Sequence, residues 1–298
     1  MSRSRLLRAV PVVLVLAATG LAVAPRAQAP TPAAAPQDAR TWLGRNAEIE
    51  AYLRTVQMLS FDDLSVGVTK PKRAHLPPGG PMQYLVWKAI QPARYGGYWE
   101  SYKSEIAAYE LDKLLALNMV PPTVEKVHKG EHGAAVMWAA PAKSFKDLGG
   151  KGAPTPPAAL ENAWARQLVR AKMFHNLIAD IDPNLGNWLV DPAWNLILID
   201  FSRCFTTDLA MKHELTRVDP DLWARMQALT EPALTTAIGA WVGRGERQAL
   251  LKRRDSMQKL IDRLVKERGE AYVFMRDVGK LIDVRSRRAS ARRAPSAG

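Results

Sequence analysis

The pattern of apolar and polar positions divides the chain into two parts of different character. In the first part, short apolar and β-branched runs predict strands at residues 84–90, 124–127 and 134–138. In the second part, apolar residues recur every three or four positions, which is typical of amphipathic helices. The predicted helices begin at residue 158 and, further on, cover residues 218–229, 232–242 and 248–266. Strands followed by helices indicate an α+β fold.

Two further helices are predicted inside the strand-rich part. Residues 38–59 place a set of apolar side chains on one side, namely Trp42, Ile49, Leu53, Val56 and Leu59. A second helix from residue 105 to about residue 118 has a similar set, namely Ile106, Tyr109, Leu111, Leu114 and Leu115. Residues 70–73, 77–81 and 141–157 are rich in Pro, Gly or basic residues and predict loops. The last of these stretches is the expected linker inside the folded part.

Three polar residues in the second part indicate a phosphoryl-transfer site. Asp182 is followed five residues later by Asn187, and an apolar run then ends in Asp200, thirteen residues after Asn187. Phosphoryl transfer from ATP uses one carboxylate to orient the accepting hydroxyl, while an Asn amide and a second carboxylate hold Mg²⁺. A short hairpin between Asn187 and Asp200 would bring these two groups together.

Residues in the first part supply the matching groups for the phosphates. Lys88 is the one basic residue in the apolar run at residues 84–90. Glu105 opens the helix predicted seventeen residues later, where a partner for such a Lys is expected. Gly67 lies in a short segment that could form a tight strand-turn-strand cover, because glycine lets the backbone approach a phosphate closely.

This order of residues resembles the atypical branch of the protein-kinase-like superfamily, over about residues 60–205. The branch includes the phosphatidylinositol 3/4-kinase catalytic domains, the HipA-like bacterial kinases and the secretory-pathway casein kinases. The resemblance implies a two-lobed protein-kinase-like fold, with a small antiparallel-sheet N-lobe, a helical C-lobe and ATP in the cleft between them. The positions that carry the resemblance are Gly67, Lys88, Glu105, Asp182, Asn187 and Asp200.

The resemblance also implies a role for each position. Lys88 would hold the phosphates and Glu105 would hold Lys88. Asp182 would be the catalytic carboxylate, while Asn187 and Asp200 would be the Mg²⁺ ligands. The implied nucleotide-binding residues are Gly67, Lys88, Glu105, Met137 and Trp138, the last two leading into the hinge between the lobes. The implied function is transfer of the γ-phosphate of ATP to a hydroxyl of an unknown protein, lipid or sugar acceptor.

Other interpretations stay open at the level of sequence. Taken singly, each residue has a common structural role: an exposed charge on a strand or helix, an ordinary turn, or a cap at a strand end. The loop after Asp182 has Pro183 and Asn184 where a basic residue is often found, and Ser202 replaces the glycine of the usual Asp-Phe-Gly. These departures keep one alternative open, a kinase-fold binding module without turnover. A second alternative is an envelope-associated scaffold that acts through the basic C-terminal tail.

The first 29 residues have the features of a secretory signal peptide. Three Arg precede the apolar stretch at residues 10–24, and Ala27-Gln-Ala29 fits a cleavage site that would leave Pro30 as the first residue. The alternative is an uncleaved anchor, although the apolar stretch is short for a membrane span. We therefore predict export to the periplasm or the extracellular space.

The net charge of +13 is concentrated at the two ends of the chain. The leader carries four Arg and no acidic residue, and residues 276–298 carry seven basic residues against two acidic ones. This basic tail is predicted to be disordered, with loose attraction to an anionic envelope. No aromatic residues interleave its arginines, so specific nucleic-acid binding is not expected. The predicted parts are residues 1–29 (signal peptide), 30–59 (Pro/Ala linker and helix), 60–140 (N-lobe), 141–275 (C-lobe) and 276–298 (tail).

Cysteine and histidine usage suggests no further chemistry. The single Cys204 allows no internal disulfide and is predicted to be a small packing residue. Four histidines show no metal-ligand spacing and are expected to be structural or exposed, namely His128, His132, His175 and His213.

Overall fold

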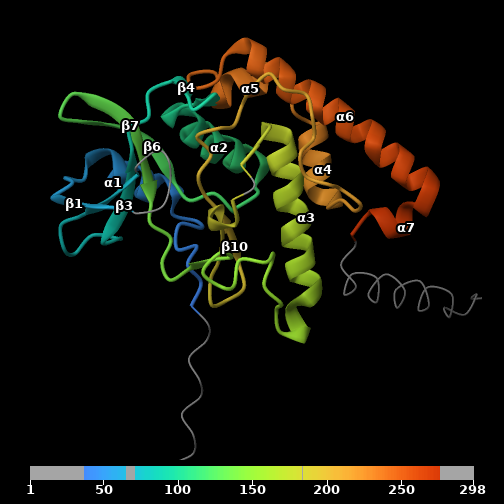
Figure 1. Cartoon of the computed structure of the whole chain (residues 1–298), viewed down its shortest axis with the longest axis horizontal. Helices are drawn as coiled ribbons and strands as arrows, with labels where there is room; N and C mark the ends of the chain where they lie inside the picture. The colour runs from blue at the N-terminus through green and yellow to red at the C-terminus, as the bar shows by residue number, and fades with distance from the viewer. Residues whose placement is uncertain (1–36, 65–70, 183, 276–298) are drawn as a thin grey trace, which may run out of the picture. The chain divides into compact units, whose positions relative to one another are not determined.

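A five-stranded antiparallel sheet forms the N-terminal part of the protein (Figure 1). The computed structural model describes residues 37–64, 71–182 and 184–275. In spatial order the strands are β1 (Ser60–Asp63), β2 (Lys72–His75), β3 (Tyr84–Lys88), β7 (Glu131–Met137) and β6 (Thr123–His128). The three strands predicted from the apolar runs are confirmed. The predicted loop at residues 70–73 is partly wrong, because β2 begins at Lys72, where the antiparallel ladder with Trp87 of β3 starts.

Two helices accompany this sheet. Helix α1 (Asn46–Thr55) contributes Ile49 and Leu53 to an apolar cluster that also contains Leu85 and Val124 of the sheet. It is shorter than the predicted helix at residues 38–59, because Gly44 adopts a left-handed turn conformation just before it. Leu59 lies beyond the end of α1 and is 54% exposed, so its assignment to the apolar side was wrong.

Helix α2 (Tyr102–Leu115) carries Glu105 on its first turn. Ser101 caps its N-terminus by accepting a hydrogen bond from the backbone N–H of Lys103, and Ala116 ends it in the left-handed conformation. The helix therefore begins three residues before the predicted start and stops before residue 118. Ten of its residues are buried, but Leu114 is exposed, contrary to the predicted apolar side.

A small hairpin before α2 was not predicted. Strands β4 (Ala93–Tyr95) and β5 (Tyr98–Glu100) are joined by Gly96 and Gly97, both with positive φ. A two-residue turn of this kind requires positive φ at both positions, which glycine adopts without steric cost. The hairpin places Glu100 directly before the cap of α2.

The C-terminal part is mainly helical. It contains α3 (Glu161–Ile178), α4 (Pro220–Gln227), α5 (Glu231–Ile238), α6 (Arg244–Arg268) and α7 (Glu270–Val273). Two short 3₁₀ turns, η1 (Ala158–Leu160) and η2 (Leu185–Asn187), and a three-stranded sheet complete it. That sheet is formed by β8 (Lys143–Ser144), β9 (Trp188–Val190) and β10 (Leu196–Leu198). The predicted helices of this part are confirmed within a few residues at each end.

The expected linker at residues 141–157 is partly structured. It contains β8, which pairs with β9, and Phe145, which is buried against Trp164 and Trp188. The rest of the stretch is turns and irregular backbone, as predicted. The strand was not predicted, because the Gly and Pro content alone indicates a loop and the burial of Phe145 depends on distant aromatic residues.

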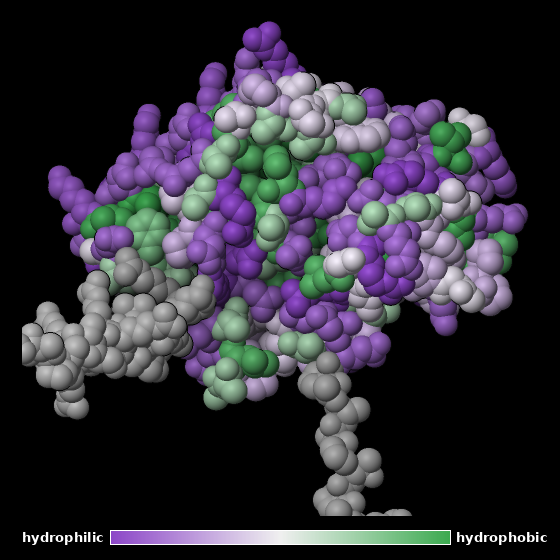
Figure 2. All heavy atoms as spheres, turned by 180° about the vertical axis from the view of Figure 1, so that it is seen from behind, coloured by the Kyte–Doolittle hydropathy of each residue, from purple (hydrophilic) through white to green (hydrophobic). Residues whose placement is uncertain are grey.

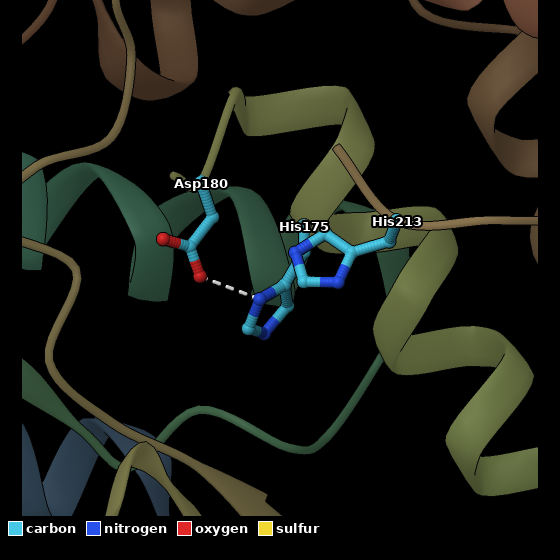
Figure 3. A group of neighbouring side chains, drawn as sticks. All are labelled: His175, Asp180 and His213. Atoms are coloured by element: carbon cyan, nitrogen blue, oxygen red, sulfur yellow. Dashed lines mark ion pairs between the residues drawn. The ribbon is translucent and has the colours of Figure 1, made fainter. Parts of the chain in front are cut away.

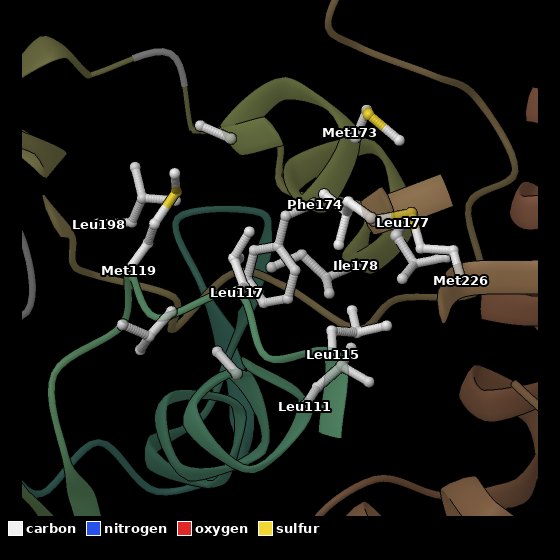
Figure 4. Packing of buried hydrophobic residues seen from close by; sticks show 14 of the residues in the cluster. Leu111, Leu115, Leu117, Met119, Met173, Phe174, Leu177, Ile178, Leu198 and Met226 are labelled. Carbon is white, nitrogen blue, oxygen red and sulfur yellow. The ribbon is translucent and has the colours of Figure 1, made fainter. Parts of the chain in front are cut away.

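One large apolar core joins α2 to the C-terminal part. Leu111 and Leu115 of α2 share it with Phe174 and Leu177 of α3 and with Leu198 of β10 (Figure 4). The core also contains Cys204, which is buried, as expected for a packing residue. On the face shown in Figure 2, exposed apolar residues form separate small groups within a hydrophilic surface. No helix among the described residues is long and apolar enough to cross a bilayer.

Candidate active site

Lys88 is the centre of a buried ionic cluster. It is the last residue of β3 and is 6% exposed. Its ammonium group lies 2.7 Å from Oε1 of Glu105 and 2.7 Å from Oδ1 of Asp200. The three residues come from β3, from the first turn of α2 and from the segment after β10. The predicted pairing of Lys88 with Glu105 is therefore present, and Asp200 joins it.

Charge balance explains why this Lys can stay buried. Burial favours the neutral amine, but the attraction of the Asp200 and Glu105 carboxylates outweighs it and raises the pKa of Lys88. Burial also raises the pKa of Glu105, against the attraction of Lys88. The side chain of Asp200 is 26% exposed, against 3% for Glu105. The ammonium is thus compensated on both sides, and Asp200 is the carboxylate that a ligand can reach.

The backbone at Asp200 has an uncommon conformation, and the carboxylate is held by Lys88. Asp200 has φ of 68°, a left-handed conformation that is uncommon outside glycine. The next residue, Phe201, donates its backbone N–H to Oε2 of Glu105 at 3.1 Å. Ser202, which replaces the expected glycine, does not have positive φ and accepts a hydrogen bond from the N–H of Ser101 through its carbonyl. The left-handed residue of this segment is therefore the aspartate.

The Asp182 loop is held by successive hydrogen bonds from backbone to side chain. Asp180 accepts from the N–H of Asp182, Asp182 accepts from that of Asn184, and Asn184 accepts from that of Gly186. The chain then forms η2, and Asn187 is buried at its end. Its carbonyl accepts a hydrogen bond from the N–H of Ile199 at 3.0 Å, so Asn187 lies beside the residue that directly precedes Asp200. The predicted hairpin exists: it is β9 paired with β10.

The side-chain amide of Asn187 is the unsatisfied group of this loop. Its Nδ2 is buried and has no hydrogen-bond partner among the described residues. A buried polar atom without a partner costs roughly 1–3 kcal/mol. Rotation of the amide by 180° exchanges its nitrogen and oxygen, so either atom can face this position. A group that binds here would remove the cost.

A cluster missed by the sequence analysis adjoins this loop through Asp180, which accepts from the N–H of Asp182; it consists of His175, Asp180 and His213 (Figure 3). His175 at the end of α3 places Nδ1 2.5 Å from Oδ2 of Asp180, and His213 lies beside both. Burial would raise the pKa of Asp180, but His175 outweighs it and lowers that pKa. These are residue types that bind metals, and their ligand atoms lie within 4.8 Å of one another.

The distances in this cluster favour an ion pair over a metal centre. Two ligands of one tetrahedral zinc ion stand about 3.3 Å apart, since each lies about 2.0 Å from the metal. His175 and Asp180 are closer than that. His175 and His213 were expected to be structural or exposed, and His175 is buried in this ion pair; what the sequence analysis did not predict is the contact between the two histidines. Their contact spans 38 positions between an α-helix and a loop, so no local spacing could reveal it.

A second missed group is the ion pair between Glu100 and Arg203. Nε and Nη2 of Arg203 lie 2.9 and 2.8 Å from Oε1 of Glu100, which is fully buried. Nη1 of Arg203 lies 4.0 Å from Oδ2 of Asp182. The signal in the sequence was an Arg three residues after Asp200, but its partner belongs to the unpredicted hairpin.

The remaining predicted positions stand apart from the ionic cluster. Met137 is buried opposite Leu85 and packs in the same apolar cluster as Ile197 of β10, while its N–H is donated to the carbonyl of Pro122. Trp138 follows β7, and its ring contacts Tyr84 at 6.2 Å between centroids. Gly67 lies outside the described residues. The nucleotide-binding roles of these positions stay predictions.

A cavity of about 540 Å³ lies near this site but is not formed by it. Trp87 and His128 line it, and Glu100 is the member of the groups described above that reaches it. Neither Lys88 nor Asp200 lines it. The candidate site is therefore identified by the contacts among Lys88, Glu105 and Asp200, and not by this cavity.

Comparisons with known proteins establish the fold. No family model and no curated protein matches the sequence. Solved structures do match: a Golgi casein kinase has 13% identity and a TM-score of 0.58, over 77% of this chain and 79% of that chain. A hydra Fam20 with sugar has 14% identity and a TM-score of 0.58, over 78% and 92%. The Golgi casein kinase with Mn/ADP bound has 13% identity and a TM-score of 0.56, over 77% and 78%.

At such low identity the likeness concerns the fold alone. The expected resemblance to the atypical kinases is confirmed at that level, as are the antiparallel sheet in the N-terminal part and the helices in the C-terminal part. The protein has an atypical protein-kinase-like fold.

Proposed function

We propose that this protein is an atypical kinase that transfers the γ-phosphate of ATP to a hydroxyl group. One observation carries the proposal: Lys88, Glu105 and Asp200 come from three distant segments and meet at distances of 2.7 Å in a kinase-like fold. A structure of similar fold contains Mn/ADP, which supports a nucleotide and a divalent metal as ligands here.

The residues present fit a divalent metal such as Mg²⁺. Hard cations take oxygen ligands from carboxylates and amides. Asp200 offers a carboxylate that is partly exposed and held through one oxygen by Lys88, and Asn187 offers a buried amide with an unpaired end. Asn187 and Asp200 would hold Mg²⁺, which when bound offsets the charge of the ATP phosphates.

Each remaining residue has a task in this proposal. Lys88 binds the phosphates, and Glu105 keeps its ammonium in place. Asp182, with a side chain 19% exposed, accepts the proton of the hydroxyl that attacks the γ-phosphorus. Its carboxylate is steadied through the N–H of Asn184, and its backbone is steadied by Asp180.

A kinase-fold binding module without turnover is the second candidate. The observation in its favour is the direct contact of Lys88 with Asp200, which occupies one oxygen of a proposed metal ligand. In such a module the ionic cluster would be a stabilising element, and nucleotide would bind without transfer.

Calorimetric titration of residues 30–298 with ATP, with and without Mg²⁺, separates the candidates when combined with a transfer assay that includes autophosphorylation. Metal-dependent binding with transfer supports the kinase. Binding without transfer or hydrolysis supports the module. If no nucleotide binds with any divalent metal, both candidates are wrong.

We also propose that the protein is exported, with its basic tail in loose contact with an anionic envelope. The support is the pattern of the leader and the charge of residues 276–298, both outside the described residues. N-terminal sequencing of protein from its native host should find Pro30 as the first residue. An intact Met1 in a cytoplasmic fraction would contradict export.

A further inference from the structure

The guanidinium of Arg203 has one edge bound to the protein and one edge directed at the candidate site. Nε and Nη2 both contact Oε1 of Glu100, and the group lies over the ring of Tyr98, with Cζ 4.7 Å from the ring centroid. Glu100 and Tyr98 belong to the β4–β5 hairpin, whereas Arg203 follows Asp200. The N-terminal part therefore sets the position of a cation from the C-terminal part.

The other edge lies beside one carboxylate of the site, that of Asp182. Nη1 is 4.0 Å from Oδ2 of Asp182, which is beyond hydrogen-bond length, and it has no hydrogen bond among the described residues. Burial opposes the charge of Arg203, but Glu100, Asp182 and Asp200 together raise its pKa. The side chain is 20% exposed, so a ligand can reach it. The N–H groups of this edge therefore lie close to Asp182 and remain available to a ligand.

Charge balance shows what this edge could bind. Lys88 is already compensated by Glu105 and Asp200, and Asp182 adds a further negative charge. Mg²⁺ offsets part of this charge when bound, yet a transferring phosphoryl group also needs donors on its own oxygens. Guanidinium presents paired N–H donors in a plane that matches phosphate oxygens. The usual basic residue after Asp182 is absent from the sequence, and Arg203 stands beside that carboxylate.

We propose that Arg203 binds the oxygens of the transferring γ-phosphoryl group and that Glu100 positions it. The proposal rests on the proposed kinase function. In the transfer, a lone pair of the acceptor oxygen forms the new P–O bond and its proton passes to Asp182. The bond between the γ-phosphorus and the β,γ-bridging oxygen breaks, and its electron pair stays on ADP. Arg203 donates hydrogen bonds throughout and exchanges no proton.

The test compares Arg203→Ala and Arg203→Lys with wild type. We expect Arg203→Ala to lower the transfer rate by about 10²- to 10³-fold, as when one transition-state donor is lost. The dissociation constant of Mg-ADP should change less than threefold, whereas affinity for Mg-ADP with aluminium fluoride, which imitates the transferring group, should fall by a factor similar to the rate. Added guanidinium ion should restore at least tenfold of the lost rate in Arg203→Ala, and Arg203→Lys should keep an intermediate rate.

Arg217→Ala is the matched control, since Arg217 also lies over a tyrosine ring, that of Tyr272, at 5.7 Å. Its rate and affinities should equal those of wild type. If the ion pair between Glu100 and Arg203 is purely structural, Arg203→Ala will lower the affinity for Mg-ADP with and without aluminium fluoride by the same factor, and guanidinium ion will not restore the rate. Each of these two results would overturn the proposal.

The outcome also separates this proposal from the proposed function. If wild type transfers phosphate and Arg203→Ala transfers equally well, the role of Arg203 alone is wrong. If wild type binds Mg-ADP but neither transfers nor gains affinity from aluminium fluoride, both are wrong.

Discussion

The ionic cluster of Lys88 and the Asp182 loop are the two parts of the candidate site, and they are built in opposite ways. In the cluster, long-range ion pairs at 2.7 Å join three segments, and the central ammonium is compensated on both sides. In the loop, most hydrogen bonds run between residues two positions apart, and the amide of Asn187 is left with an unpaired end.

This difference predicts that the ionic cluster determines stability and nucleotide binding, whereas the Asp182 loop determines turnover. A buried ion pair that loses one partner leaves an uncompensated charge, so changes in the cluster should affect folding as well as nucleotide binding. A loop held by its own backbone N–H groups tolerates a change in one side chain, so changes there should affect turnover. Asp200 belongs to both regions, because it contacts Lys88 and follows the β9–β10 hairpin.

Asp200→Asn should have the largest effect, because it removes a charge that both regions use. We expect transfer to be lost and Mg²⁺ to give little gain in nucleotide affinity, measured by calorimetry and single-turnover transfer. Asp208→Asn is the control, since Asp208 is an exposed aspartate paired with Lys212. If Asp200→Asn bound Mg-ATP as tightly as wild type, Asp200 would not be a metal ligand.

Asp182→Asn should separate turnover from binding. Loss of a general base typically lowers the rate by about 10²- to 10⁴-fold. The dissociation constant of Mg-ATP should stay within threefold of wild type, and the thermal midpoint should change little. An equal loss of binding and rate would place Asp182 in the cluster instead of on the acceptor side.

Lys88→Met and Glu105→Gln should weaken folding and binding together. Breaking a buried pair costs about 3–5 kcal/mol, which is an upper limit here because the side chain of Asp200 is 26% exposed. In a double-mutant cycle measured by chemical denaturation, the two changes should be non-additive by about 0.5–3 kcal/mol. Additive losses of stability and of ATP affinity would show that the contact contributes nothing.

Low pH should weaken the cluster of His175, Asp180 and His213 that adjoins the Asp182 loop, with the smallest effect of the four. Burial lowers the pKa of His213 from its ordinary 6.5 to about 4. Repulsion by His175 and Lys172 acts in the same direction, and attraction by Asp180 opposes it. As the pH falls, the unfolded chain binds this proton first, so the free energy of unfolding should decrease from pH 6.5 to 4 and be unaffected above pH 6.5.

We expect the free energy of unfolding to decrease by about 1–2 kcal/mol. This is less than the whole pKa shift would give at about 1.36 kcal/mol per pKa unit, because His213 is partly exposed and solvent screens its charge. Denaturation of His213→Gln between pH 4 and pH 7 should show that much less pH dependence than wild type. An identical pH dependence in the two proteins would contradict the assignment.

Local patterns in the sequence predicted those features that depend on neighbouring residues. The strands of the sheet follow from their apolar runs, and the helices of the C-terminal part follow from their period. The pairing of Lys88 with Glu105 was predictable because the resemblance to the atypical kinases assigns both positions. The ends of α1 and the packing of Phe145 were not, since a left-handed Gly44 and a distant aromatic partner decided them.

The sequence by itself determined the α+β order and the candidate residues at Lys88, Glu105, Asp182, Asn187 and Asp200. Only the tertiary structure decided how they meet. Asp200 reaches Lys88 across 112 positions, Arg203 reaches Glu100 across 103, and His213 reaches His175 and Asp180 from a separate loop. Contacts of this kind depend on how the helices and strands pack. Burial in a common core brings together side chains that are far apart in the sequence, and their spacing along the chain does not reveal this.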